Sequence, residues 1–252
     1  MGGLSHDVHI DKALSEFAIG YKPEGFIADA IFPVVTVGKQ SDRYYEFSRA
    51  DHLRRENTAR AAGTEARKIV RNVSSGTYYA PNFALKYPVP IEDKINADPI
   101  VTAGLYDTAA EYIMDKLLID WEVRVANQVT SGTNVGSYSA VSSAWNGAGD
   151  VIGDINAAID NVQDSTGVRP NKIVMGNAAW RSARRDATVR NLINGTNNGG
   201  GFASRAAFAN LFDMPESNLM IAGAYQNTGG EGLDESLEQI WNDNVLVYYT
   251  PE

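Results

Sequence analysis

Few residues in this chain could do chemistry, and the three histidines are the first to consider. His6 and His9 flank Asp7 and Val8, so their imidazoles could chelate a metal, and His52 lies in an arginine-rich stretch. Chain termini fray unless they are tied down, so we predict no specific metal site there. The chain has no cysteine and contains neither a His-Glu-x-x-His nor a Gly-x-Ser-x-Gly motif. These observations predict that the protein is not an enzyme.

Phosphate-binding signals are equally weak. The run Gly199–Gly201 lacks the Lys-Ser/Thr pair of a phosphate-binding loop and follows no predicted strand. One predicted helix carries four arginines, which could bind phosphate but more simply form a solvated or subunit-facing side: Arg181, Arg184, Arg185 and Arg190. We therefore predict no cofactor.

The composition restricts the class of protein further. The chain has 252 residues, 44% of them hydrophobic, which can supply a sizeable core. It contains no apolar run long enough to span a membrane. The net charge of −9 argues against a nonspecific nucleic-acid binder. Residues 39–71 are locally +4, which leaves −13 for the remainder, so this basic stretch is either an internal partner for acidic surface or a binding arm.

The main element that could position a site is a predicted helix over residues 98–129. Asp98 can cap it, and Pro99 suits its first position. A helix of this span is about 45 Å long. Most of its circumference is apolar, and its acidic residues share one narrow stripe: Asp107, Glu111, Asp115 and Glu122. The stripe is either the solvated edge of a core helix or a surface offered to a partner.

Residues 1–38 are predicted to form an arm with a short strand at 34–37. Its apolar side chains are Phe26, Ile27, Ile31 and Phe32. Two interpretations remain open: an N-terminal strand that pairs with the core of its own chain, or an arm that packs on another subunit.

Residues 39–79 predict a long hairpin with strands near 43–47 and 66–74. A two-stranded hairpin of this length cannot build its own core, so it is either a mobile surface loop or a segment that lies on another surface. Its arginines suit contacts with carboxylates. The best candidates are Arg49, Arg54, Arg55 and Arg60. The prolines at 81, 88 and 90 then confine residues 80–97 to an edge strand or extended segment.

A second unit is predicted from residue 150, after a Gly- and Ser-rich linker at 131–149. We expect helices near 150–162, at 178–193 after a cap at Asn177, and at 204–212, with a flexible loop at 194–201. We expect strands at 172–176, 218–225 and 239–250, the last bent near Asn242. This order predicts an α+β or small α/β unit.

The order of these parts resembles the tailed-bacteriophage major capsid protein family, which has the Hong Kong 97-type fold. Four stretches carry the resemblance in the family's order: FIADAIFPVVTV (26–37), IEDKINAD (91–98), RPNKIVMGNAAW (169–180) and QIWNDNVLVYYTP (239–251). The resemblance implies an α+β fold with an N-terminal arm (1–38) and an extended β-hairpin E-loop (39–79). It also implies a P-domain (80–149) with a long spine helix (98–129) and an α/β A-domain (150–252).

The resemblance implies a major capsid protein that self-assembles as hexamers and pentamers into an icosahedral phage head enclosing double-stranded DNA. Assembly would take place in the host bacterial cytoplasm, with scaffold, portal and decoration proteins as further partners. DNA would be enclosed without specific binding. The alternative on the same fold is an encapsulin-type bacterial nanocompartment shell. A hydrolase or transferase is disfavoured because no nucleophile and base pair is evident.

The sequence departs from the family near its end, where the chain usually returns a strand to the P-domain sheet. Three interpretations stay open here: the return is very short, residues near 245–250 serve as that strand, or the chain is truncated. No residue matches the lysine and asparagine that crosslink some members, so no crosslink is predicted. We expect the E-loop arginines of one subunit to lie against the acidic stripe of its neighbour, since the resemblance places the E-loop over that neighbour.

Overall fold

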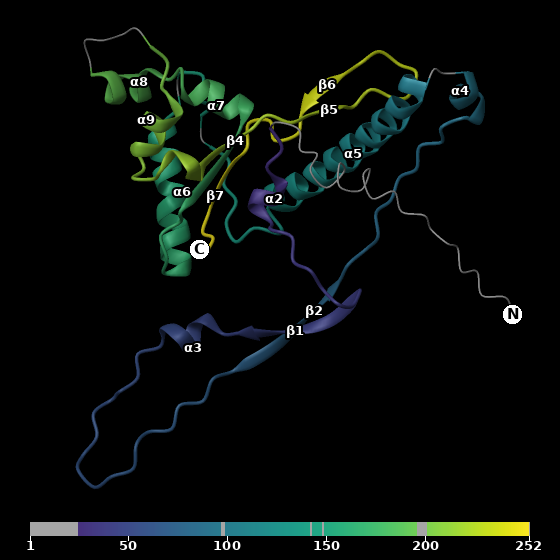
Figure 1. Ribbon diagram of the computed structural model, residues 1–252. Helices are drawn as coiled ribbons and strands as arrows, with labels where there is room; N and C mark the ends of the chain where they lie inside the picture. Colours follow the sequence, from purple (N-terminus) through teal and green to yellow (C-terminus); the bar gives the residue numbers. More distant parts are fainter. Residues whose placement is uncertain (1–24, 97–98, 142, 148, 196–200, 252) are drawn as a thin grey trace, which may run out of the picture. The chain divides into compact units, whose positions relative to one another are not determined.

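The computed structural model describes residues 25–96, 99–141, 143–147, 149–195 and 201–251. The chain divides into two compact units, one formed by residues 34–84 and the other by the rest of the described chain. Together they form a mixed α and β structure (Figure 1). Asp98, the predicted cap of the long helix, and most of the predicted loop at 194–201 lie outside the described residues.

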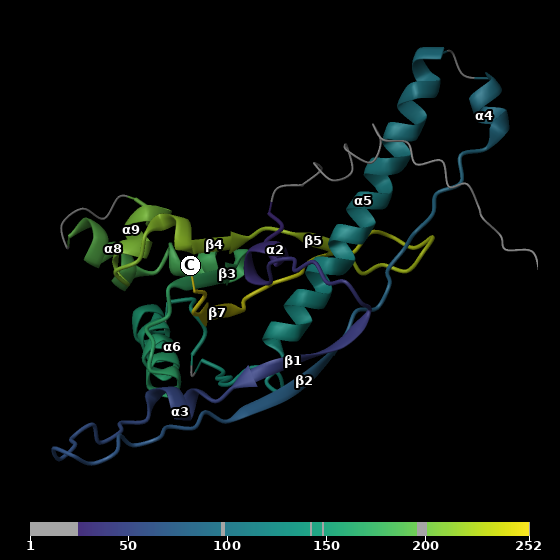
Figure 2. The same cartoon turned by 60° about the horizontal axis from the view of Figure 1, so that its bottom comes forward.

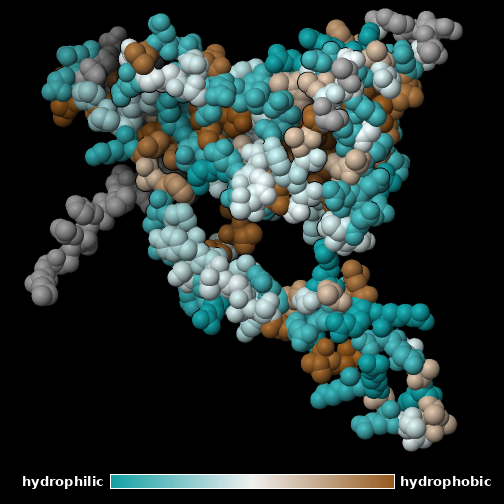
Figure 3. Space-filling view, turned by 180° about the vertical axis from the view of Figure 1, so that it is seen from behind, coloured by the Kyte–Doolittle hydropathy of each residue, from teal (hydrophilic) through white to brown (hydrophobic). Residues whose placement is uncertain are grey.

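The unit at 34–84 is a hairpin without a core. Strands β1 (Ser41–Phe47) and β2 (Val73–Tyr79) pair antiparallel, and α3 (Arg49–Leu53) follows β1. Every residue of β1 is exposed, and so are the side chains of Tyr45 and Val70. Figure 3 shows small hydrophobic patches among the hydrophilic residues on the surface. The hairpin therefore has no apolar core of its own that could stabilise it.

The predicted return strand at 66–74 is wrong in its position. Pairing ends at Phe47 because α3 follows, so residues 66–72 face no strand and β2 begins at Val73. Gly76 lies opposite Tyr44, and a Cβ there would come within 2.6 Å of the tyrosine ring. The ring of Tyr44 thus crosses the partner strand where that strand has no side chain.

The second unit contains the long helix, α5 (Pro99–Thr130, 32 residues), within one residue of its predicted bounds at each end. Before it lie α2 (Ala28–Ile31) and α4 (Ile91–Asn96). The predicted strand at 34–37 is absent from the described chain, and Val34 and Val35 are exposed. Residues 80–90 are extended but belong to no strand. Over the residues that the structure describes, no helix combines the length and apolar character that a membrane crossing needs.

A three-stranded sheet forms the centre of this unit, in the order β4–β3–β7. Strand β3 (Lys172–Gly176) pairs parallel with β4 (Leu219–Ala222) and antiparallel with β7 (Val245–Tyr248). The candidate return strand at 245–250 therefore pairs with β3, in the same sheet as β4. A separate hairpin joins β5 (Tyr225–Asn227) to β6 (Leu237–Gln239).

The predicted bend near Asn242 is present, since Asn242 has a φ of 44°. This bend brings the Asn242 carbonyl against Gly176, so closely that any Cβ at residue 176 would collide with it. Glycine is therefore required where β3 turns into the next helix. Of the predicted strand at 239–250 only β7 is a strand, apart from Gln239, which ends β6. The predicted strand at 218–225 is divided into β4 and β5.

Helices cover both faces of the sheet (Figures 1 and 2). One face packs against α6 (Val151–Thr166), α7 (Asn177–Ala183), α8 (Ala187–Asn194) and α9 (Arg205–Asn210). The opposite face packs against α2 and the C-terminal part of α5, with Trp241 in the same cluster. Between α9 and β4 lies a short 3-10 helix, Glu216–Asn218.

The single helix predicted over 178–193 is two helices, α7 and α8. Asp186 lies between them and caps α8, because its Oδ1 accepts the Val189 amide at 3.1 Å. The Arg184 carbonyl accepts the Ala203 amide instead of continuing a helical ladder. Asn177 is the first residue of α7 and not its cap, which is Gly176.

Candidate assembly interface

A buried carboxylate joins three distant parts of the second unit. Glu122 on α5 is fully buried, and its two oxygens accept from the Ile27 amide (3.1 and 3.2 Å), the Ala28 amide (2.9 Å) and Trp241 Nε1 (2.6 Å). These donors come from the start of α2 and from the bend before β7. The N-terminal segment, the long helix and the C-terminal strand thus meet at one side chain.

The local sequences explain why this junction forms. The N-cap residue of α2, Ile27, has no oxygen in its side chain and cannot satisfy the free amides of the helix start. Glu122 supplies the missing acceptor from another helix. Around it, Ile27, Ala28 and Ile31 pack with Val125 and Ala126, which lie one turn further along α5.

Burial raises the pKa of the Glu122 carboxyl above its ordinary value of 4.5. The hydrogen bonds from Trp241, Ala28 and Ile27 oppose this rise, and the charge of Asp29 adds to it. The three groups that hydrogen-bond to Glu122 are all donors, so an ionised carboxylate satisfies all of them, whereas a protonated one must turn its own hydrogen toward a donor.

The raised pKa predicts how stability depends on pH. The folded state holds the Glu122 proton more tightly than the unfolded state, so this group's contribution to the free energy of unfolding is present in full below pH 4.5. It falls as the pH rises through the raised pKa. Urea unfolding of the parent and of Glu122→Gln from pH 4.5 to neutrality should show the parent's relative stability decreasing. A difference that grows with pH would contradict this assignment, and Glu111→Gln serves as the exposed control.

The acidic stripe predicted on α5 is only partly an exposed surface. Asp107 and Glu111 are exposed and Asp115 is half-buried, but Glu122 is buried inside the chain. Glu122 therefore has no exposed surface in this chain with which to make the predicted contact with another subunit. The helical wheel could not show this, because the residues that cover Glu122 lie 95 and 119 positions away in sequence.

The arm residues divide in the same way. Ile27 and Ile31 are buried against α5 of their own chain, as part of a helix start and not of a strand, so little of either side chain is left for another subunit. Phe26 is half-buried and Phe32 is 44% exposed, so these two side chains still have apolar surface to offer.

The four arginines predicted to contact a neighbouring subunit are all exposed in the unit at 34–84. Arg54 forms an ion pair with Asp51 at 3.2 Å, whereas Arg49, Arg55 and Arg60 form no ion pair with any described residue. Their predicted contact with an acidic helix of a neighbour stays a prediction.

The described residues contain no group of three or more His, Asp or Glu side chains that could hold a metal ion. His6 and His9 lie outside the described residues, and His52 is exposed on α3. Glu122 was expected on an exposed stripe of the long helix. It is instead a buried side chain that stabilises the fold.

Comparisons with known proteins fit this arrangement. No protein-family profile matches the chain. The major capsid protein of Pseudomonas phage JBD67 is 25% identical over 248 residues, covering 95% of this chain and 77% of that protein. The major capsid protein of Burkholderia phage BcepMu is 24% identical over 258 residues, covering 100% of this chain and 80% of that protein. A phage-related protein from Bordetella bronchiseptica RB50 has a similar structure, with a TM-score of 0.70 and 19% identity over 96% of this chain and 78% of its own.

Both of these relatives are major capsid proteins of phages, and the Bordetella structure shares the fold of this chain. The chain is a homologue of the major capsid proteins of tailed phages, as its sequence predicted.

Proposed function

We propose that this protein is the shell subunit of a phage head with the Hong Kong 97-type fold, assembling as hexamers and pentamers into an icosahedral capsid around double-stranded DNA. The observation that carries the proposal is similarity to two phage major capsid proteins over nearly the whole chain. In this proposal residues 1–38 are the N-terminal arm, 39–79 the E-loop, 80–149 the P-domain and 150–252 the A-domain. Assembly takes place in the host bacterial cytoplasm.

The exposed hairpin supports this proposal. Residues 34–84 form a unit with exposed apolar side chains, which gain contacts only by covering another surface. A subunit built to overlap its neighbour has such a segment. In the proposed shell the hairpin covers the adjacent subunit.

The contents of the particle distinguish the proposed phage head from a protein-filled nanocompartment. Shells purified from the natural host should contain duplex DNA that resists nuclease until the shell is opened. Portal and terminase genes should lie beside the gene for this chain. Shells that hold a cargo enzyme, encoded next to this gene, would instead identify an encapsulin-type compartment.

The E-loop contact gives a prediction of its own. Replacing Asp107 and Glu111 by lysine should leave the subunit folded, since both side chains are exposed, yet weaken assembly most at low salt. Each exposed pair contributes only about 0–1 kcal/mol, but a shell repeats it at every interface. Light scattering against salt concentration measures the effect.

A second pair of changes makes this test specific. Arg55→Glu with Arg60→Glu should restore assembly to the lysine variant if these groups pair directly. Glu231→Lys with Asp234→Lys, on the exposed loop between β5 and β6, makes the same change in net charge elsewhere. Equal assembly of the α5 variant and the parent at all salt concentrations would show that the stripe is only a solvated edge.

A further inference from the structure

Two arginines of the α7–α8 region have guanidinium donors that no acceptor satisfies. The Nε atoms of Arg184 and Arg190 are buried, and neither makes a hydrogen bond within the described residues. A buried donor without a partner is unfavourable, so such groups normally find an acceptor. Within the described residues neither Nε atom has one, although both atoms are covered by their own chain.

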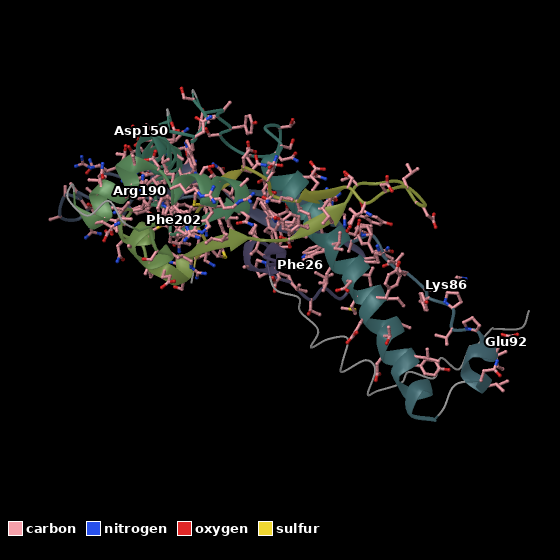
Figure 4. The ribbon with its side chains drawn as sticks, turned by 90° about the horizontal axis from the view of Figure 1, so that it is seen from above. Phe26, Lys86, Glu92, Asp150, Arg190 and Phe202 are labelled. Carbon is pink, nitrogen blue, oxygen red and sulfur yellow. The ribbon has the colours of Figure 1, made fainter. Side chains whose placement is uncertain are left out.

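Aromatic rings hold part of this arginine surface in place. The Arg184 guanidinium carbon lies 5.1 Å from the centroid of the Phe202 ring and 5.9 Å from that of Trp180. Arg185 lies 5.9 Å from the same Phe202 ring. Stacked guanidinium groups lose little conformational freedom when they bind a carboxylate. Figure 4 places the labelled Arg190 and Phe202 in the same part of the unit, far from the labelled Lys86 and Glu92.

The arginine surface is formed by Arg181, Arg184, Arg185 and Arg190. Residues 181–190 carry a formal charge of +3, since Asp186 is the acidic residue among them and is buried as the cap of α8. Arg181 and Arg185 are exposed. No carboxylate of the described residues forms an ion pair with any of the four.

A complementary surface lies on α6 of the same unit. Residues 150–166 hold four aspartates and no basic residue, a formal charge of −4. Asp150 caps the helix and Asp154 accepts from Trp145, so both are engaged. Asp160 and Asp164 are exposed, and their four-residue spacing places them on one face of the helix.

Among the described residues no ion pair joins the two surfaces within one subunit. Helix α6 contacts β7, whereas α7 contacts β3 and β4 and leads into α8, which contacts α9. Strands β4 and β7 are the two outer strands of the sheet, so α6 and the arginine surface lie toward opposite edges of it (Figures 1 and 2). A basic surface at one edge and an acidic one at the other define a head-to-tail contact between copies, which closes into a ring when the rotation allows.

We propose that the arginine surface of one subunit binds Asp160 and Asp164 on α6 of the next subunit in the same capsomer ring. The inference rests on the proposed function, because it requires copies arranged around an axis. Carboxylate oxygens from α6 would accept from the exposed guanidinium groups of Arg181 and Arg185. Arg181 and Arg185, at the edge of this surface, would set the register of the contact.

Charge exchange between the two surfaces tests the pairing. Arg181→Glu with Arg185→Glu, and separately Asp160→Lys with Asp164→Lys, should each raise the protein concentration needed for capsomer formation about tenfold or more. The two pairs of changes combined should restore capsomers toward the parent level. Sedimentation velocity measures capsomers, and circular dichroism confirms that each variant is folded. Arg181→Gln with Arg185→Gln keeps the test available if the glutamate variant does not fold.

Three outcomes would overturn the proposal. In the first, folded variants with only the arginines or only the aspartates changed form capsomers at the same protein concentration as the parent. In the second, the variant that combines both pairs of changes forms no more capsomers than either pair alone. The third is duplex DNA bound by the parent and released by the arginine changes, which would assign the surface to phosphate. A parent that forms no ring or shell at all would instead reject the proposed function. The control is Glu231→Lys with Asp234→Lys, which should form capsomers as the parent does.

Discussion

Replacing Glu122 with alanine is expected to lower the free energy of unfolding by about 3 kcal/mol or more. The change leaves three buried donors without an acceptor, namely the amides of Ile27 and Ala28 and the indole of Trp241. Each unsatisfied buried donor costs about 1–3 kcal/mol. Urea unfolding measures the loss, and limited proteolysis should show earlier cleavage around residues 25–33.

Two further variants show whether the cost arises from the lost acceptor. Glu122→Gln keeps the volume but turns an amide donor toward the same donors, so it should also destabilise the protein. Glu111→Ala removes an exposed carboxylate from the same helix and should change stability by no more than about 0.5 kcal/mol. Equal stability of the Glu122 and Glu111 variants would show that the junction does not hold the N-terminal segment.

Deleting residues 1–33 is expected to destabilise the folded subunit as well as to impair assembly. The deletion removes Ile27, Ala28 and Ile31 from the core cluster and exposes Val125 and Ala126 on α5. Fully burying each isoleucine side chain contributes about 1.5–3 kcal/mol. The truncated protein should therefore unfold at lower urea concentration and aggregate.

A shorter deletion is the matched control. Removing residues 1–24 keeps Ile27, Ala28 and every described contact of Glu122. This variant should unfold at nearly the same urea concentration as the parent. If both deletions unfold like the parent, α2 is not part of the stabilising core.

Local sequence signals were sufficient for several elements. Pro99 and the long stretch without helix breakers predicted α5 to within one residue at each end. The run from Lys172 to Gly176 predicted β3 with both bounds correct. In each case the signal lies inside the element itself, so no distant partner is needed to interpret it.

Features that depend on distant partners were not predictable in this way. Glu122 was assigned to a surface stripe because its donors, near residues 27 and 241, are remote in sequence. Residues 28–31 were interpreted as leading into a strand, but the Glu122 carboxylate stabilises them as a helix start. The break between α7 and α8 likewise depends on an Ala203 amide that reaches Arg184 from another segment.

The composition of the arm also misled the assignment of its partner. High apolar density at Phe26, Ile27, Ile31 and Phe32 suggested burial by another subunit, but density alone does not say which chain provides the cover. The structure shows that the inner pair packs on α5 of its own chain. Phe32 stays exposed and is the apolar side chain of this set that a neighbouring subunit can still cover.

The most direct test of the central claim is electron microscopy of the purified recombinant protein over a range of concentrations. A shell subunit should form capsomer rings or closed icosahedral particles, and their fraction should rise with protein concentration. A protein that stays a folded monomer at high concentration, with neither rings nor shells, would contradict the account.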